Sequence, residues 1–192
     1  LIESLLQQRT ELLSENTNLE LVMTGPEPPG SFTRDTGVVV RQMFSNAKES
    51  IFLCGFAVYQ GKDIFSALAK RMQTVPTMNV RMCLNIQRPH GDQSPSDVLI
   101  KRFRKQFTET QWPDDVGLPE IFFDPRTLEG SGSGKTASLH AKFVIADQQR
   151  VFLSSANFTE AAQQRNIEAG LITNNAALAR DLSAHFQSLI DN

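Results

Sequence analysis

Hydrophobic residues fall into two patterns that alternate along the first part of the chain. Residues 50–59 form a nearly continuous hydrophobic run rich in strand-forming residues, which is typical of a strand buried on both faces, and a second strand is predicted over 79–86. Residues 63–72 and 97–107 instead carry hydrophobic side chains every three or four positions, as the core-facing side of a helix does. Strands that alternate with helices predict crossover connections and a parallel sheet between helices.

The later part of the chain continues this alternation with one change of direction. Two hydrophobic runs, 139–146 and 150–153, are separated by a short polar turn, and that arrangement predicts a β-hairpin. The other predicted elements are strands over 118–123 and 167–172 and helices that start at Thr159 and Ala176. The predicted fold class is therefore α/β, with a mixed, mainly parallel β-sheet flanked by helices on both faces.

Residues 1–30 follow neither pattern for long. Leucines stand at helical spacing near the start, before glycine and proline clusters at 25–26 and 28–30 stop any regular element: Leu1, Leu5, Leu6, Leu12 and Leu13. We expect a leading helix and a Pro/Gly-rich tether. With 192 residues, of which 40% are hydrophobic, the chain can bury one core but is short for two full-sized domains. We therefore interpret residues 1–192 as a single domain.

Net charge, cysteine spacing and the length of the hydrophobic runs limit the partners and ligands that we expect for the chain. The formal net charge is -2, so attraction to a polyanion must come from a local basic patch and not from the net field. Cys54 and Cys83 lie in predicted strands at a spacing that matches no metal-binding pattern, and we expect buried free thiols. No run approaches the ~20 hydrophobic residues of a membrane span, and no secretory leader is visible. We expect a soluble, cytoplasmic protein without stable membrane association, metal or cofactor.

Candidate chemistry is concentrated around the predicted hairpin. His140 and Lys142 are two residues apart on a predicted strand and would point to the same side of the sheet. Ser155 and Asn157 follow the second arm, just before Thr159 can cap a helix. An imidazole beside an ammonium and neutral donors suits a phosphoryl group, because a neutral imidazole can attack phosphorus while the cation and the dipoles stabilise the developing charge.

The string His140-Ala-Lys142, with Asp147 five residues further on, resembles the HxKxxxxD signature of the phospholipase D superfamily. The downstream Ser154-Ser155-Ala-Asn157 is similar to its Gly-Ser-x-Asn element. The stretches 157–162 and 165–168 resemble the small bacterial endonucleases of that superfamily, and a looser likeness exists to phospholipase-D-like proteins of bacterial phage-defence systems. The resemblance covers about the last third of the chain.

The resemblance implies a role for each residue of the motif. His140 would form a covalent phosphohistidine, Lys142 and Asn157 would bind the non-bridging oxygens, and Ser155 would support them. Asp147, although part of the catalytic motif, would hold the loop and would not transfer a proton. Glu168 would orient a catalytic imidazole.

Ser154 departs from the family pattern, since glycine usually stands there. A side chain at this position would crowd the phosphate or a tight backbone turn.

Other segments outside this motif give less specific indications of function. The segment from Glu129 through the Gly/Ser loop to Lys135 imitates a nucleotide-binding phosphate loop, but it lacks the first glycine and precedes a strand. We interpret it as a loop beside the site, from which Lys135 can reach a substrate phosphate. His90 and His185 lack neighbouring motif residues and are expected at the surface. A basic cluster is either a solvated helix face or a phosphate track: Lys101, Arg102, Arg104 and Lys105.

These observations predict a metal-independent phosphodiesterase that cleaves DNA or RNA through a phosphohistidine. One alternative is a phospholipase or phosphatidyl-transfer enzyme. Another is an inactive nucleic-acid- or protein-binding module of a larger complex, such as a phage-defence complex. Because the mechanism that the motif implies uses two imidazoles and the chain has one motif, we expect a homodimer in which His140 of each subunit serves a shared site.

Overall fold

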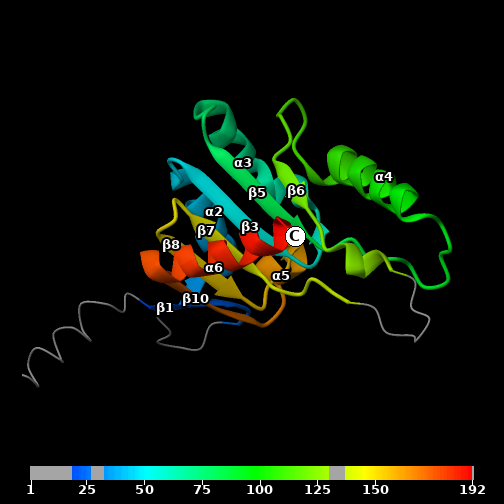
Figure 1. Cartoon of the computed structure of the whole chain (residues 1–192). Coiled ribbons are helices and arrows are strands. Elements are labelled where there is room, and N and C mark those ends of the chain that lie inside the picture. The colour runs from blue at the N-terminus through cyan, green and yellow to red at the C-terminus, as the bar shows by residue number, and fades with distance from the viewer. Residues whose placement is uncertain (1–18, 27–32, 130–136, 192) are drawn as a thin grey trace, which may run out of the picture.

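The computed structural model describes residues 19–26, 33–129 and 137–191. Within them, eight strands form one sheet in the order β2-β1-β10-β8-β7-β3-β5-β6 (Figure 1). These strands are β1 (Glu20–Thr24), β2 (Arg34–Asp35), β3 (Ser50–Gly55), β5 (Asn79–Leu84), β6 (Glu120–Phe122), β7 (Phe143–Ala146), β8 (Arg150–Ser154) and β10 (Glu168–Asn174). A separate small pair joins β4 (Val58–Tyr59) to β9 (Phe158–Thr159).

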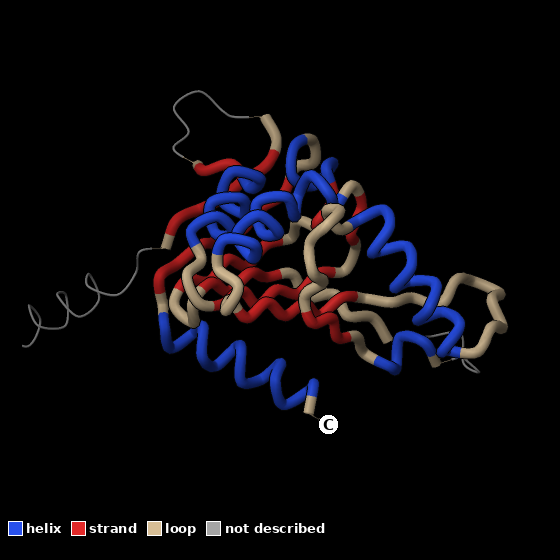
Figure 2. The backbone as a smooth tube through the Cα atoms, turned by 90° about the horizontal axis from the view of Figure 1, so that it is seen from above, coloured by secondary structure: helices blue, strands red, loops and turns tan. Residues whose placement is uncertain are grey.

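Helices lie on both faces of the sheet, as the view along it in Figure 2 shows. They are α2 (Thr36–Asn46), α3 (Gly61–Thr74), α4 (Ser96–Gln106), α5 (Glu160–Gln164) and α6 (Ala176–Ile190). Two short turns of other helix types follow α4 and β6, namely η1 (Phe107–Gln111) and η2 (Pro125–Leu128). None of the helices described is both long and apolar enough to cross a bilayer.

The core has one layer on each face of the sheet. Phe44 of α2 and Phe65 of α3 are fully buried in the cluster that includes Leu53 of β3. On the opposite face, Phe186 of α6 packs against the rings of Phe52 and Phe143 with centroids 6.2 and 4.8 Å away. The predicted mixed sheet between two helical layers is therefore confirmed.

The prediction that the sheet is mainly parallel was wrong. Strand β3 pairs in parallel with β5, β5 with β6, and β1 with β2, but the pairs β3/β7, β7/β8, β8/β10 and β10/β1 are antiparallel. Parallel pairing follows the strand–helix alternation of the first half. Pairing in the second half is antiparallel because β7 and β8 form a hairpin and β10 then pairs antiparallel with β8.

Part of the predicted N-terminal tether is a strand. Residues 20–24 form β1, which pairs with β10. Val22 and Thr24 are buried while Leu21 is exposed, the two-residue alternation of a strand with one covered face. The leading helix predicted before it lies outside the described residues, as do residues 27–32.

Helix α2 was absent from the predicted elements. Asp35 caps it by accepting a hydrogen bond from the backbone N–H of Val38 at 2.8 Å, and Val39, Val40 and Met43 are buried. A capping residue ahead of hydrophobic side chains at helical spacing was a readable signal for this helix.

The two cysteines are free and buried, as predicted. Cys54 and Cys83 are register partners on the parallel strands β3 and β5. Burial raises the pKa of the Cys83 thiol to about 11 and raises that of Cys54 as well. Both side chains therefore stay protonated and pack as small hydrophobic residues.

Candidate active site

Most of the predicted site residues lie at the open end of the β7–β8 hairpin, whereas Asp147 lies at its turn end. Phe143, the first residue of β7, pairs with Leu153 of β8 and with Cys54 of β3. Residues 139–142 therefore extend past the end of β7, next to the carboxyl end of β3. His140 and Lys142 precede the strand, whereas a strand over 139–146 was predicted. The carboxyl ends of strands are where α/β folds commonly place their ligands.

Hydrogen bonds to the neighbouring strands hold this extension in place. The backbone N–H of Leu139 donates to the Asn85 side-chain oxygen at 3.0 Å, and the carbonyl of Lys142 accepts from the N–H of Ser154 at 3.2 Å. Asn85 is the first residue after β5. The segment that carries His140 is thus fixed on both sides by the sheet.

The His140 ring, the Lys142 ammonium and the Phe56 ring form one cluster. Lys142 Nζ lies 3.3 Å from both ring nitrogens of His140 and donates to the His140 carbonyl at 2.9 Å. The Phe56 ring centroid is 4.8 Å from that of His140 and 5.7 Å from Lys142 Nζ. His140 is exposed and Lys142 is half-buried. An exposed imidazole is therefore held against a cation by an aromatic ring.

Partial burial lowers the pKa of Lys142. Loss of hydration lowers the pKa of its ammonium below the usual range, and the nearby Glu168 carboxylate only partly opposes that shift. An ammonium that has lost water gains more from an incoming phosphate oxygen than a fully hydrated one does.

Glu168 is held by its own neighbours. The hydroxyl of Ser155 donates to Glu168 Oε2 at 2.5 Å, and the side-chain amide of Asn166 donates to Oε1 at 3.2 Å. The Ser155 oxygen in turn accepts from the backbone N–H of Ala169 at 3.1 Å. Among the described residues, these bonds join Glu168 to Ser155 and Asn166 and not to His140.

Ser154, which departs from the Gly-Ser-x-Asn element that the sequence resembles, turns its hydroxyl toward backbone. Its Oγ accepts from the N–H of Ala156 at 3.0 Å and donates to the carbonyl of Ala169 at 3.4 Å. Its register partner on β10 is Gly170, where an added Cβ would lie 2.7 Å from the Leu153 carbonyl. The atoms that require a glycine at 170 are therefore the Leu153 carbonyl and the Phe152 ring, and not the Ser154 side chain.

Asn157 presents an unsatisfied polar atom. Its Oδ1 is buried without a hydrogen-bond partner among the described residues, and its backbone carbonyl accepts from the Gln163 amide at 3.1 Å. Lys142, Ser154 and Gln163 line one small cavity of about 10 Å³, together with the residues on each side of Asn157. A buried unpaired amide oxygen costs roughly 1–3 kcal/mol, and a cost of this kind is characteristic of functional sites.

Asp147 lies at the opposite end of the hairpin. Its carboxylate accepts hydrogen bonds of 2.8–3.0 Å from the backbone N–H groups of Lys48, Glu49 and Ser50. Its own backbone has a φ of 54°, in the left-handed region that aspartate tolerates in turns. The structure therefore places Asp147 away from the His140 cluster, where it fixes the loop that leads into β3.

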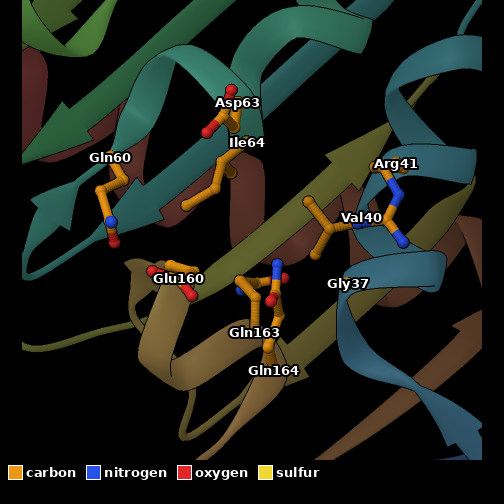
Figure 3. Close-up of a pocket in the computed structure, with 9 residues that line it drawn as sticks. All are labelled: Gly37, Val40, Arg41, Gln60, Asp63, Ile64, Glu160, Gln163 and Gln164. Atoms are coloured by element: carbon orange, nitrogen blue, oxygen red, sulfur yellow. The ribbon is translucent and has the colours of Figure 1, made fainter.

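A second cavity, of about 60 Å³, lies behind the Asn157 loop between α2, α3 and α5 (Figure 3). It mixes charged and amide side chains, among them Arg41, Gln60, Asp63, Glu160 and Gln163. Gln163 links it to the site through its bond to the Asn157 carbonyl. His140 and Lys142 do not line it.

Four contributors to the site were not anticipated. Phe56, Asn85, Gln163 and Asn166 position the predicted residues by the contacts given above. Phe56 and Asn85 follow directly after the ends of β3 and β5 but lie inside the strands predicted over 50–59 and 79–86, so no local signal marked them as site residues. Lys135 and the Gly/Ser loop lie outside the described residues. Within the described ranges, no three His, Cys, Asp or Glu side chains gather as a metal site would require.

Comparisons with known proteins agree with the fold described above. DISARM protein DrmC from Bacillus paralicheniformis is 29% identical over 161 residues, and the aligned part spans 82% of this chain and 58% of DrmC. NucT from Helicobacter pylori superimposes with a TM-score of 0.61 at 18% identity, covering 91% of this chain and 97% of NucT.

The phospholipase D family member Nuc from Salmonella typhimurium superimposes with a TM-score of 0.53 at 22% identity, covering 89% of this chain and 92% of Nuc. The sequence model of the family described as cardiolipin synthase, PLD-like domain, matches residues 40–190. That match takes in most of the sheet, the two helical layers and the His140 cluster, so the chain belongs to this family of phospholipase-D-like domains.

Proposed function

We propose that the chain is a metal-independent phosphodiesterase that hydrolyses nucleic acid, with His140 as nucleophile. The observation that carries this proposal is the exposed His140 ring held 3.3 Å from the Lys142 ammonium. Beside it lies the loop in which the buried Asn157 oxygen has no partner. A nucleophile beside a cation on an exposed surface matches the needs of phosphoryl transfer, and the side-chain N–H groups of Asn157 are the donors that this loop would offer to a phosphate oxygen.

The proposed reaction has two steps. A ring nitrogen of neutral His140 bonds to phosphorus, the phosphorus–oxygen ester bond breaks, and the departing oxygen takes a proton from a general acid. Water then attacks the phosphohistidine, gives its proton to the same group, and releases His140. Lys142 and Asn157 bind the non-bridging oxygens in both steps, with Ser155 and Glu168 as support.

The general acid that we propose is His140 of the partner subunit in a homodimer. The chain supplies one imidazole to the site, since His90 and His185 lie elsewhere on the chain. Ile167, next to Glu168, is a large hydrophobic side chain that is 78% exposed, which supports an interface there. A two-fold axis would bring two His140 side chains to one phosphate.

Nucleic acid is the proposed substrate because 157–162 and 165–168 resemble the small endonucleases of the superfamily. A phospholipid is the second candidate, because the matching family is described by a lipid enzyme. The test is to incubate the purified chain with end-labelled DNA, RNA and phospholipid vesicles in the presence of a chelator. Release of labelled fragments from nucleic acid supports the proposal, and release of headgroup from vesicles alone would replace it.

An inactive module of a larger complex is the third candidate. The chain spans 58% of the length of DrmC, and Ser154 replaces the usual glycine. Analysis for phosphohistidine in mixtures quenched with SDS and kept at alkaline pH, where this acid-labile linkage survives, separates this candidate from the enzyme. The proposal expects the label on His140, none in His140→Asn, and full labelling in the surface control His90→Asn.

A further inference from the structure

Helix α4 projects from the body of the domain and is fixed at its base. Figures 1 and 2 show it standing beyond β6, away from the layers on the sheet. Leu99 packs with Ile86 and Leu128 in a small cluster of its own. Before the helix, the Arg88 guanidinium donates to the carbonyls of Leu128, at 2.9 Å, and Ser94, at 2.6 Å. The loop that enters α4 is thereby tied to the chain segment after β6.

The other end of α4 is tied to α3. The helix passes into the π-turn η1, where the Gln111 side-chain oxygen accepts from the N–H of Gly61 at 2.9 Å. Trp112 is fully buried, with ring centroids 6.1 Å from Phe107 and 5.7 Å from Phe65. With anchors at both ends, α4 is a defined arm.

The outer face of this arm is basic. Leu99 and Phe103, four residues apart, pack toward the body, so Lys101 and Lys105 lie on the opposite side, with Arg102 and Arg104 beside them. Four cations and one carboxylate thus stand on an eleven-residue helix, in a chain whose net charge is -2. This is a local basic patch of the kind that a polyanion requires here.

Two of the four cations have no ion-pair partner in the described part of the chain. Lys101 pairs with Asp97 at 3.2 Å and Arg102 with Asp92 at 2.8 Å. Arg104 and Lys105 are exposed, and the ion pairs found among the described residues include neither. Their charges are available to an external anion.

The arm lies at the same end of the sheet as His140. The loop into α4 starts at Asn85, at the carboxyl end of β5, and Asn85 binds the N–H of Leu139, the residue before His140. β5 pairs in parallel with β3, whose carboxyl end adjoins residues 139–142. A chain molecule lying across the His140 site can therefore continue along this end of the domain toward α4.

We infer that α4 is a phosphate-binding arm that holds the backbone of a nucleic acid outside the position of cleavage, chiefly through Arg104 and Lys105. This inference rests on the proposed function and deepens it, because it names a polymer with phosphates on both sides of the scissile bond as substrate. The alternative, a solvated helix face, predicts no effect of these cations on binding.

The test is equilibrium binding of a fluorescein-labelled 30-nucleotide DNA to the full chain over a series of KCl concentrations, with His140→Asn added to the wild type and to every variant so that the DNA is not cleaved. Arg104→Gln with Lys105→Gln should weaken binding about tenfold at low salt and reduce the slope of log affinity against log salt by about 1.4, one counterion release of roughly 0.7 for each lost contact to a single strand. Arg104→Lys with Lys105→Arg keeps both charges and should bind as the wild type does.

The matched control is Lys70→Gln with Arg180→Gln, two exposed cations on α3 and α6. If the α4 variant and this control bind alike, or the wild type binds no DNA, the inference is overturned. Cleavage of the same DNA is scored separately, so that the two proposals can fail independently. If the chain cleaves DNA but the α4 substitutions do not weaken binding, only the inference about α4 is overturned. If binding depends on α4 but no DNA is cleaved, only the proposed catalysis is overturned.

Discussion

The two ends of the β7–β8 hairpin use polar side chains in opposite ways. At the turn end, the Asp147 carboxylate accepts four short contacts from three consecutive backbone N–H groups. At the open end, Lys142 has lost water, the Asn157 Oδ1 is buried without a partner in the described chain, and His140 is exposed. One short motif supplies residues to both ends. Fully satisfied polar groups hold a loop, whereas unsatisfied ones leave capacity for a ligand.

This difference predicts that substitutions at the two ends affect different quantities, turnover at one end and stability at the other. Changes at the open end should reduce turnover and leave the free energy of unfolding nearly unaltered. Changes at the turn end should do the reverse. A motif read only as a string would assign catalysis to all of its members.

The largest expected effect is that of His140→Asn. Removing the nucleophile should lower kcat by on the order of 10⁴-fold or more, as loss of a catalytic nucleophile does elsewhere. The ring is exposed, so the midpoint of urea unfolding should match that of the wild type. Initial rates of DNA cleavage and unfolding curves measure both. Turnover above a tenth of the wild-type rate would remove His140 from the mechanism.

Lys142→Ala should cost about a hundredfold or more in kcat, because it removes a preorganised charge from the developing oxyanion. The loss should be smaller than that of His140→Asn and should appear in single-turnover rates. Lys62→Ala, which removes an exposed lysine paired with Asp114, is the control and should be neutral. A near-normal rate for Lys142→Ala would mean that its ammonium does not reach the phosphate.

The lowered pKa of Lys142 predicts opposite pH trends for activity and stability. Burial disfavours the ammonium, so its pKa in the folded chain lies below the unfolded value of about 10.4. Activity that needs the ammonium is lost as pH rises through the folded-state pKa. Between the two pKa values the unfolded chain binds more protons, so the contribution of this group to the free energy of unfolding rises with pH.

A pH profile of kcat/KM and urea unfolding at matched pH values check this prediction. Lys142→Arg keeps a charge at every accessible pH and should lack the alkaline fall in activity. If that fall persists in the arginine variant, it belongs to another group.

Asp147→Ala tests the role of the turn end of the hairpin in stability. Three backbone N–H groups lose their acceptor, but Lys48 and Glu49 are exposed enough for water to replace part of the loss. The free energy of unfolding should fall by about 1–3 kcal/mol. Activity per folded molecule should stay within about twofold. A large loss of kcat in a variant that unfolds at the wild-type urea concentration would place Asp147 among the catalytic residues.

The smallest expected effect is that of a chelator. Lys142 supplies the positive charge that a metal ion would otherwise supply to the phosphate, so EDTA should leave the rate unchanged. Loss of activity in EDTA that Mg²⁺ restores would contradict the prediction. A matched assay with added NaCl should in contrast weaken substrate binding.

Local patterns predicted much of the fold and most members of the site. The hairpin, α3, α4 and α6 followed from hydrophobic spacing, and the motif located His140, Lys142, Asn157 and Glu168 on elements that the structure brings to one end of the sheet. Parallel or antiparallel pairing could not be predicted in the same way, because it depends on which strands meet after folding.

Contacts between distant residues explain the remaining differences. Phe56 reaches His140, and Asn85 reaches Leu139, across more than fifty positions of sequence. Strand β1 is short, and its register is set by β10, nearly 150 residues later. Nothing within a local window distinguishes such residues from ordinary loop positions.

Trp112, at the foot of the α4 arm, gives the molecule a built-in optical reporter. It is the single tryptophan of the chain, its indole N–H donates to the Val116 carbonyl at 3.3 Å, and aromatic rings surround it. Its emission should lie at short wavelength in the native protein and shift to the red when α3 and η1 separate. The spectrum therefore distinguishes a variant whose arm has detached from one that has lost only surface charge.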